Sequence, residues 1–328
     1  MMRRRQTFAL LAGPLAAPML SRGAFAQAAW APTRAVTMVV PFPPGGPTDL
    51  AARVVQAGMS AALGQPVVID NRPGATGAIG SRYVAGQPAD GHTLLVAASG
   101  TLTINPVIMR NPGYDVEKDF APVTLVMTAP NMLVVHPSVP ARTVAEVVAW
   151  MKTIPGGPSY ASSGVGSSEQ LGMELFKLLT RTEAVAVPFT GGPAAATAVI
   201  QNQAPVAVLN AATVGPQVLS GALRGIAIAG PRRFAQLPDV PTMTEQGLPD
   251  LVSGSWTAIV APAATPAAAL ERLNAVIVAA RKTPEVTERL ARVGFAVDAT
   301  SREDCGRLIA SDLARWRQVV RDARIEQI

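Results

Sequence analysis

The apolar positions of the chain follow two alternating patterns. Short β-branched runs, typical of buried strands, fall at residues 36–40, 67–69, 93–97, 124–126, 132–135, 185–187, 206–209, 225–229 and 257–260. Between them, stretches with helical spacing predict helices near residues 48–63, 143–153, 168–180, 194–202 and 266–282. Because strands alternate with helices, the chain is predicted to be an α/β protein with mainly parallel sheets.

The last segment shows the helical spacing most clearly. Its apolar residues fall on one stripe: Cys305, Leu308, Ile309, Leu313, Trp316, Val319 and Val320. Such a stripe predicts a helix that packs against the core and carries no chemistry.

The first 26 residues have a third pattern. Arginines at positions 3–5 precede an apolar stretch at 8–20, and a small-x-small end follows at 24–26. This is typical of a secretory signal peptide, which we expect to be cleaved after Ala26. A membrane anchor is the alternative, but the apolar stretch is shorter than the roughly 20 residues that span a bilayer. We therefore expect a periplasmic protein, and the pair Arg4-Arg5 leaves Sec and twin-arginine export open.

Composition narrows the classes of function. A length of 328 residues favours two domains, and 49% hydrophobic residues are ample for a core. The formal charge is +6, but four of the arginines lie in the leader, and without them the balance is only +2. A nearly neutral body argues against nucleic-acid binding. Cys305 is the only cysteine, so no intrachain disulfide can form.

The loop after the first strand has the features of an anion site. Gly46 is placed to cap a helix that Pro47 begins, which leaves the amide of Thr48 free in the first turn. Unpaired N–H groups and the helix dipole attract an anion. Gly45 and Gly46 place no Cβ in the way of a ligand.

The same loop also has a purely structural interpretation. Asp49 offsets the helix dipole and pairs with Arg53 one turn on, which is the role we favour for that pair. Residues 187–193 repeat the pattern of 39–47, with a strand, a Pro-Phe exit, a Gly-Gly-Pro turn and a helix. The repeat predicts one similar loop in each half of the protein.

Two further loops supply small polar groups. In residues 160–171, Ser167 and Gln170 have the spacing of a capping box before another helix. Residues 97–101 follow an apolar strand and offer Ser99 and Thr101. In open α/β sheets such strand ends line the ligand crevice.

Catalytic and cofactor motifs are weak or missing from the sequence. His92 and His136 are the only histidines, and neither lies near a serine elbow. Two separate histidines and one cysteine do not make the usual zinc ligand sets. Glu169 stands where the dinucleotide fingerprint needs its third glycine. We therefore expect no catalytic residue, no metal and no cofactor.

Several motifs together resemble a known family. They are residues 41–53, 70–77, 90–94, 119–122, 187–192, 237–242 with Glu245 and Gly247, and 261–266. In this order they resemble the substrate-binding proteins of tripartite tricarboxylate transporters, the Bug or TctC family. The resemblance covers nearly all of the chain after the leader.

The resemblance implies a two-lobed periplasmic binding protein fold of type II, with hinge strands that cross between the lobes. Lobe 1 would comprise residues 30–128 and 251–328, and lobe 2 residues 129–250. Such a protein closes on one small carboxylated ligand and passes it to membrane permease subunits. We expect it to act as a monomer.

The resemblance also implies the site residues, which hold the ligand through backbone amides, small hydroxyls and water. Carried over by position they are Phe42, Gly45, Gly46, Thr48, Asp49, Ser99 and Thr101 in lobe 1, and Ser163, Gly164, Gly166, Ser167, Phe189, Gly191 and Asn210 in lobe 2. Three positions depart from the family pattern. Many relatives have His at Gln170, a basic residue at Thr190 and an acid near Asn210. The pocket is then less charged than in relatives, so the ligand cannot be inferred from any of them.

Two other functions use the same pocket. One is a sensor partner that presents the bound ligand to a receptor. The other is a periplasmic enzyme acting on a carboxylate, such as an isomerase that uses Asp49 as its base.

Overall fold

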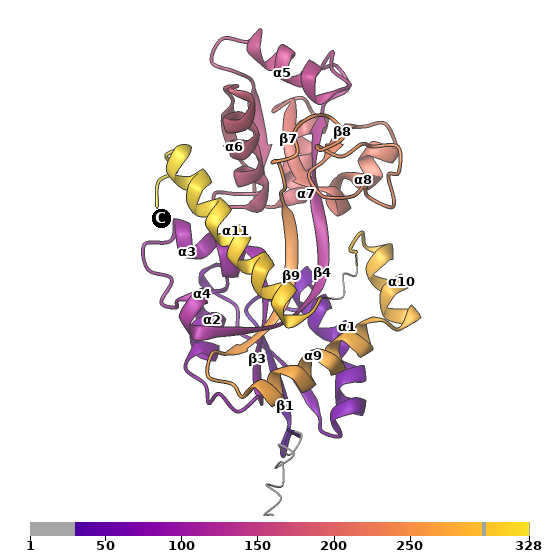
Figure 1. Ribbon diagram of the computed structural model, residues 1–328. Helices are drawn as coiled ribbons and strands as arrows, with labels where there is room; N and C mark the ends of the chain where they lie inside the picture. Colours follow the sequence, from indigo (N-terminus) through magenta and orange to yellow (C-terminus); the bar gives the residue numbers. More distant parts are fainter. Residues whose placement is uncertain (1–29, 297–299, 328) are drawn as a thin grey trace, which may run out of the picture.

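A single mixed sheet links two α/β lobes (Figure 1). The computed structural model describes residues 30–296 and 300–327, so the predicted signal peptide lies outside the described residues. The strands are β1 (Val36–Val40), β2 (Val67–Asn71), β3 (Thr93–Ala98), β4 (Phe120–Val135), β5 (Ser159–Ser162), β6 (Val185–Pro188), β7 (Val206–Asn210), β8 (Arg224–Ile228) and β9 (Gly254–Pro262).

The strand order is β2-β1-β3-β9-β4-β7-β5-β6, with β8 paired to β4. β1 is parallel to β2 and β3 in one lobe, and β5 is parallel to β6 and β7 in the other. The predicted parallel strands are therefore confirmed within each lobe. The antiparallel pairings all involve β4 or β9, and β4 pairs with strands of both lobes.

β4 is one strand of 16 residues where the sequence predicts two. Pro130 interrupts the apolar pattern and favours a turn there. It is tolerated because β4 changes its partner at this point, from β9 up to Pro130 to β7 from Asn131 onward. The strand therefore crosses from lobe 1 into lobe 2 without a break, as Figure 1 shows.

Helices cover both faces of the sheet. They are α1 (Pro47–Leu63), α2 (Ala78–Ala85), α3 (Asn105–Ile108), α4 (Val116–Asp119), α5 (Val144–Lys152), α6 (Ser168–Thr180), α7 (Gly192–Ile200), α8 (Ala211–Leu219), α9 (Ala267–Arg281), α10 (Pro284–Arg292) and α11 (Arg302–Asp322), with short η1 (Ala75–Gly77) and η2 (Gly100–Ile104). All five predicted helices form. The sequence pattern missed α8 because Pro216 lies inside it, and proline usually ends a helix.

In lobe 1, α1, α9 and α10 pack on one face of the sheet, and α2, α4 and the start of α11 pack on the other. In lobe 2, α7 and α8 cover one face and α5 and α6 the other.

The predicted stripe on the last helix is confirmed. Cys305 and Ile309 are buried in the core of lobe 1, whereas Leu313, Trp316 and Val320 join the cluster that contains α5 and α6. In Figure 1, α11 runs diagonally across the front of both lobes. The same cluster includes residues of α3, so this side of the molecule has a core shared by the two lobes.

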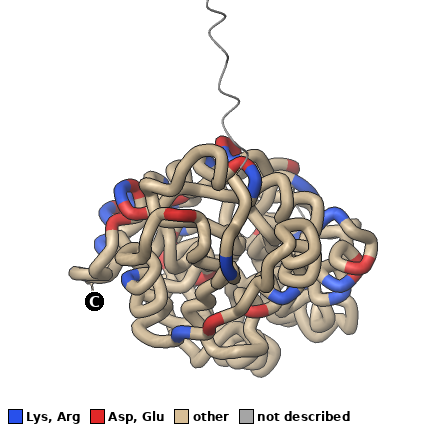
Figure 2. Tube along the Cα trace, turned by 90° about the horizontal axis from the view of Figure 1, so that it is seen from below, with Lys and Arg blue, Asp and Glu red and all other residues tan. Residues whose placement is uncertain are grey.

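Seen from the end of lobe 1, the charged residues of the described part form no large group of one sign (Figure 2). Figure 2, which looks at the end of lobe 1, shows basic and acidic residues interspersed. No helix among residues 30–296 and 300–327 is long and apolar enough to cross a membrane.

Candidate binding site

The carboxyl ends of the parallel strands in the two lobes face each other. Ala98, at the end of β3, lies opposite Thr257, which lies opposite Met127 on β4. Asn210, at the end of β7, lies opposite Asn131 on the same strand. These two levels are four residues apart along β4, or about 13 Å at the rise of a strand. The loops of both lobes therefore extend toward each other at the strand ends, which is where open α/β sheets bind ligands.

The first loop into this gap has the predicted structure. Gly46 is the N-cap of α1 with extended φ and ψ, and Pro47 is the first helical residue. Gly45 has φ +88°, which favours glycine. The loop between β6 and α7 is similar, because Gly191 has φ +90° and precedes a helix whose second residue is Pro193. The predicted repeat of one loop type in each lobe is confirmed.

Asp49 holds the first loop in place. Its carboxylate is 1% exposed and accepts hydrogen bonds from Arg53 Nε (2.7 Å), Gly45 N (3.0 Å) and Asn71 Nδ2 (3.1 Å). Burial alone would raise the pKa of Asp49, but the hydrogen bonds from Arg53, Gly45 and Asn71 lower it below its usual value. The structural role expected for the Asp49–Arg53 pair is confirmed. The Gly45 amide is also engaged, which leaves the start of α1 to present the anion-binding groups.

A cavity of about 500 Å³ lies at this edge of lobe 1. Its lining residues are Phe42, Pro43, Pro44, Gly46, Pro47, Thr48, Ala98, Met127, Ser255, Trp256, Thr257 and Phe295. Of the predicted residues, Phe42, Gly46 and Thr48 line it directly. None of the lining residues is charged at neutral pH.

Two buried threonines give the cavity its hydrogen-bonding groups. Thr48 and Thr257 are 5% and 3% exposed, and neither hydroxyl has a hydrogen-bond partner among the described residues. Because both residues line the cavity, a ligand there can hydrogen-bond to these hydroxyls. The first-turn amides of α1 lie beside Thr48, so these groups together can hold one carboxylate. Sequence reasoning missed Thr257 because it stands at the start of an ordinary apolar strand.

Ser99 and Thr101 are buried, but neither lines the cavity. The carbonyl of Ser99 accepts the hydroxyl of Thr103, and the carbonyl of Thr101 accepts the hydroxyl of Tyr114. The Thr101 hydroxyl has no partner among the described residues and lies near the Phe42 ring, with both close to Gly77. Ser99 and Thr101 therefore lie behind the cavity wall and do not line it.

Six of the seven predicted residues of lobe 2 lie in two adjacent loops that do not line this cavity, and the seventh, Asn210, caps α8. Ser163 accepts the amide of Gly191 through its carbonyl (3.2 Å), which joins the loop after β5 to the loop after β6. Phe189 is half-buried in the core beside α7 and lies near Gly164.

The predicted capping box at the start of α6 is confirmed with one variation. Ser167 Oγ accepts the amide of Gln170 (3.1 Å), and the Gln170 side chain reaches back to the amide of Gly166 (2.6 Å). Gln170, the residue that departs from the family pattern, is thus used to fix the loop. Gly166 has φ +72°, and an added Cβ would lie 2.1 Å from Ile108 Cδ1, so this loop reaches lobe 1.

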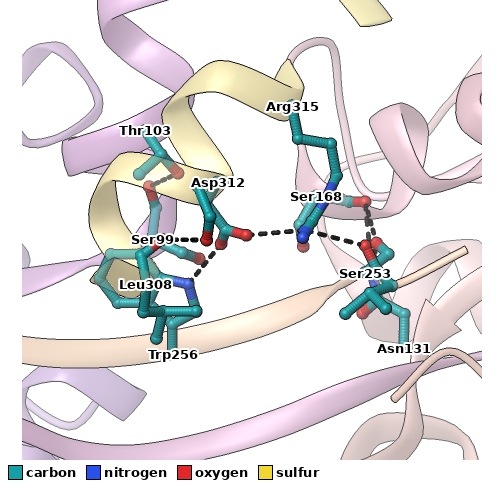
Figure 3. Close-up of polar contacts among 11 residues, drawn as sticks. Ser99, Thr103, Asn131, Ser168, Ser253, Trp256, Leu308, Asp312 and Arg315 are labelled. Carbon is teal, nitrogen blue, oxygen red and sulfur yellow. Dashed lines mark hydrogen bonds and ion pairs between the residues drawn. The ribbon is translucent and has the colours of Figure 1, made fainter. Parts of the chain in front are cut away.

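Polar contacts at the crossing between the lobes form a second buried group (Figure 3). Asn131 Nδ2 donates to Ser253 Oγ (2.8 Å) and to the carbonyl of Ser168 (3.2 Å), and Ser253 Oγ donates to the same carbonyl (3.1 Å). Asn210 reaches the cavity edge, because its Nδ2 donates to Ser255 Oγ (2.8 Å). Both crossing segments are therefore tied to the helix starts of lobe 2.

The last helix is tied to the same crossing. Trp256 Nε1 donates to Asp312 Oδ2 (2.7 Å), and Arg315 Nη1 bonds both Asp312 Oδ1 (2.7 Å) and the carbonyl of Val252 (3.1 Å). Burial raises the pKa of Asp312, against the opposing effects of Arg315 and Trp256. Trp256 therefore directs its indole to the α11 side, whereas Ser255 and Thr257 face the other side by strand alternation.

Among residues 30–296 and 300–327, no three His, Cys, Asp or Glu side chains gather closely enough to hold a metal ion. The site consists of hydroxyls, amides and apolar walls. Two α/β lobes that share crossing strands, with facing strand ends and a cavity between uncharged walls, define a two-lobed binding protein.

The chain belongs to the tripartite tricarboxylate transporter receptor family, TctC, a family of periplasmic solute-binding proteins; the family profile matches residues 51–325. It is 35% identical over 292 residues to Protein BugT of Bordetella pertussis, covering 89% of this chain and 90% of that protein. It is equally identical over 295 residues to a protein from the tcbD-tcbE intergenic region of Pseudomonas sp. strain P51, covering 90% and 88%.

Solved structures confirm the fold. R. palustris Rpa4515 with adipate matches with a TM-score of 0.74 and 34% identity, over 90% of this chain and 99% of that one. MatC (Rpa3494) from Rhodopseudomonas palustris with bound malate matches with a TM-score of 0.71 and 32% identity, over 88% and 99%. The Bug/TctC resemblance and the two-lobed fold expected from the sequence are confirmed.

Proposed function

We propose that this receptor captures a small organic carboxylate in the cavity beside α1 and delivers it to the permease subunits of a tripartite tricarboxylate transporter. The observation that carries the proposal is a pair of hydroxyls that line the cavity and have no hydrogen-bond partner among the described residues, those of Thr48 at the start of α1 and Thr257 on β9. Similar proteins crystallised with adipate and with malate support a carboxylate as the ligand class.

The available groups are sufficient for tight binding. The Thr48 amide and the hydroxyls of Thr48, Ser255 and Thr257 supply four donors around one cavity. A hydrogen bond to a charged group contributes roughly 1.5–3 kcal/mol. Micromolar affinity needs about 8 kcal/mol, so three or four well-aimed donors reach it before any apolar contact is added.

Closure of the lobes would complete the site. We assign residues 30–128 and 251–328 to lobe 1 and residues 129–250 to lobe 2, with β4 and the segment before β9 as the hinge. The loops at 163–167 and 189–191 would then approach the ligand from lobe 2. Since a ligand that touches both lobes favours the closed arrangement, binding and closure are coupled.

The surroundings of the Asp49 carboxylate support a binding protein that does not catalyse a reaction. The carboxylate of Asp49, which an isomerase would use as its base, is saturated by Arg53, Gly45 and Asn71. Its role is to shape the loop, as a receptor requires.

Isothermal titration calorimetry of the purified protein against a panel of organic acids tests the proposal. We expect at least one carboxylate to bind with micromolar affinity or better. Thr257→Val keeps the shape of the side chain but removes the hydroxyl, so Kd should rise about tenfold or more. Thr197→Val is the matched control, because Thr197 is an exposed threonine on α7 whose hydroxyl bonds only the carbonyl of Pro193. A panel without any heat of binding, or equal Kd for Thr257→Val and the wild type, would refute the proposal.

A further inference from the structure

The walls of the cavity indicate what the rest of the ligand looks like. We propose that the ligand is a monocarboxylate with an aromatic or alicyclic body, and that short di- and tricarboxylates bind poorly; this inference rests on the proposed function. The inference follows from how polar and apolar groups are distributed around the cavity.

The hydrogen-bonding groups lie at one place. Thr48 at the start of α1 and Thr257 on β9 both line the cavity, and they are the buried residues with free hydroxyls there. The Ser255 hydroxyl already accepts from Asn210 and has only its proton left to offer. This is enough for a single carboxylate group.

The remaining wall is apolar and large. It comprises Phe42, Phe295, Met127 and the prolines Pro43, Pro44 and Pro47. Phe42 and Phe295 are partly buried against the same hydrophobic cluster of lobe 1, so each keeps ring surface available at the cavity. Flat apolar surfaces of this kind bind rings better than short, heavily hydrated chains.

Both phenylalanines are held in place before any ligand arrives. The ring of Phe42 passes Gly77 so closely that a Cβ there would lie 3.2 Å from Phe42 Cζ. The backbone at Phe295 is fixed by the bond from its amide to the carbonyl of Leu290 (2.9 Å) and by the adjoining bridge between Ala296 and Thr128, and its side chain packs against the hydrophobic cluster of lobe 1. A preorganised wall loses little side-chain freedom on binding, which strengthens its preference for a matching shape.

The uncharged lining of the cavity disfavours di- and tricarboxylates. The cavity has no Lys, Arg or His in its lining. Arg53, one turn into α1, is paired with Asp49. On a short ligand, a second carboxylate that faced the apolar wall of this cavity would lose its hydration and meet neither a cation nor a free hydroxyl there, and burying an unpaired charge is costly.

Calorimetric titration with four acids tests this inference. The probes are benzoate, cyclohexanecarboxylate, succinate and citrate, on the wild type and on Phe42→Ala and Phe295→Ala. We expect benzoate or cyclohexanecarboxylate to bind at least about tenfold more tightly than succinate or citrate. Both Phe variants should lose about tenfold for the ring acids, with a much smaller change for succinate. Leu219→Ala, which shortens a leucine on α8 that is 70% exposed, is the control and should change nothing.

The outcomes separate this inference from the proposed function. If succinate or citrate binds most tightly, the inference is overturned while the receptor function stands. If ring acids bind best but neither Phe variant weakens them, the cavity is not their site and the inference is also overturned. If none of the four acids nor any other carboxylate of the panel binds, both proposals fail.

Discussion

Replacing Asp49 with alanine separates a scaffold role from a catalytic one. The side chain is 1% exposed and is the common acceptor for Arg53, Gly45 and Asn71. Asp49→Ala leaves the Gly45 amide without its acceptor at the base of the loop. The Asn71 side chain loses one of two acceptors, because its Nδ2 also donates to the carbonyl of Phe42 (3.1 Å). Unsatisfied donors of this kind cost about 1–3 kcal/mol.

The Arg53 contribution is smaller, because that side chain is 46% exposed and solvent screens the pair. We therefore expect Asp49→Ala to lower the free energy of unfolding by about 2–3 kcal/mol in total. For a chain of 328 residues, an unfolding entropy of about 2.1 cal/mol/K per residue makes each kcal/mol shift Tm by roughly 1.5 °C, so Tm should fall by roughly 3–5 °C. Carboxylate binding should weaken but remain saturable, since the loop is loosened while the donors persist.

Urea unfolding and calorimetric titration of the same samples measure the two effects. Asp70→Ala is the matched control, because Asp70 also pairs with an arginine, Arg72, but both side chains are at least one-third exposed. That control should cost no more than about 1 kcal/mol. An Asp49→Ala protein as stable as the wild type would refute the scaffold role. Turnover of a carboxylate by the wild type that the variant lacks would instead indicate the catalytic role.

Three other variants test separate parts of the structure. Gly166→Ala should destabilise the protein by about 1–3 kcal/mol, because Gly166 has φ +72° and an added Cβ would meet Ile108 Cδ1. Adding Ile108→Val removes that atom and should recover part of the lost stability. Strictly additive effects of the two substitutions in urea unfolding would contradict the contact. Arg233 lowers the pKa of Glu245 from its usual 4.5 to about 2, so the stability due to Glu245 is present above pH 4.5 and is lost as the pH falls to 2. Glu245→Gln should therefore reduce the dependence of stability on pH between 4.5 and 2. An unchanged slope in this range would contradict the role of the Arg233–Glu245 pair. Trp316 is 1% exposed, so Trp316→Ala leaves a cavity in the core and should lower the free energy of unfolding, measured by chemical denaturation, by about 3–5 kcal/mol. A decrease below about 1 kcal/mol would show that α11 does not stabilise the shared core.

Local features of the site could be predicted because their causes are local. Gly46 and Pro47 begin α1, and Ser167 with Gln170 begins α6, through contacts that span three or four residues. The apolar stripe of α11 is equally local, since it follows from 3.6 residues per turn. Such rules require nothing from the rest of the chain.

The partners across the sheet could not be predicted in this way. Asn131 and Ser253 are 122 positions apart, and Trp256 and Asp312 are 56 apart, yet each pair forms a buried hydrogen bond. In the sequence, nothing distinguishes Thr257 from other residues of an apolar strand. Its place at the cavity follows from the position of β9 between β3 and β4. The predicted residues at 163–167 and 189–191 likewise lie in adjacent loops only because β5 and β6 pair in parallel.

The sequence by itself determined the alternation of strands and helices, the helix starts that can receive an anion, and the family. The tertiary structure decided that β4 crosses both lobes as one strand, that Asp49 serves the loop, and that two distant threonines share one cavity with Phe42 and Phe295. The physical reason is the reach of each interaction. Periodicity and capping act within a turn or two, whereas strand order and burial depend on the free energy of the whole chain.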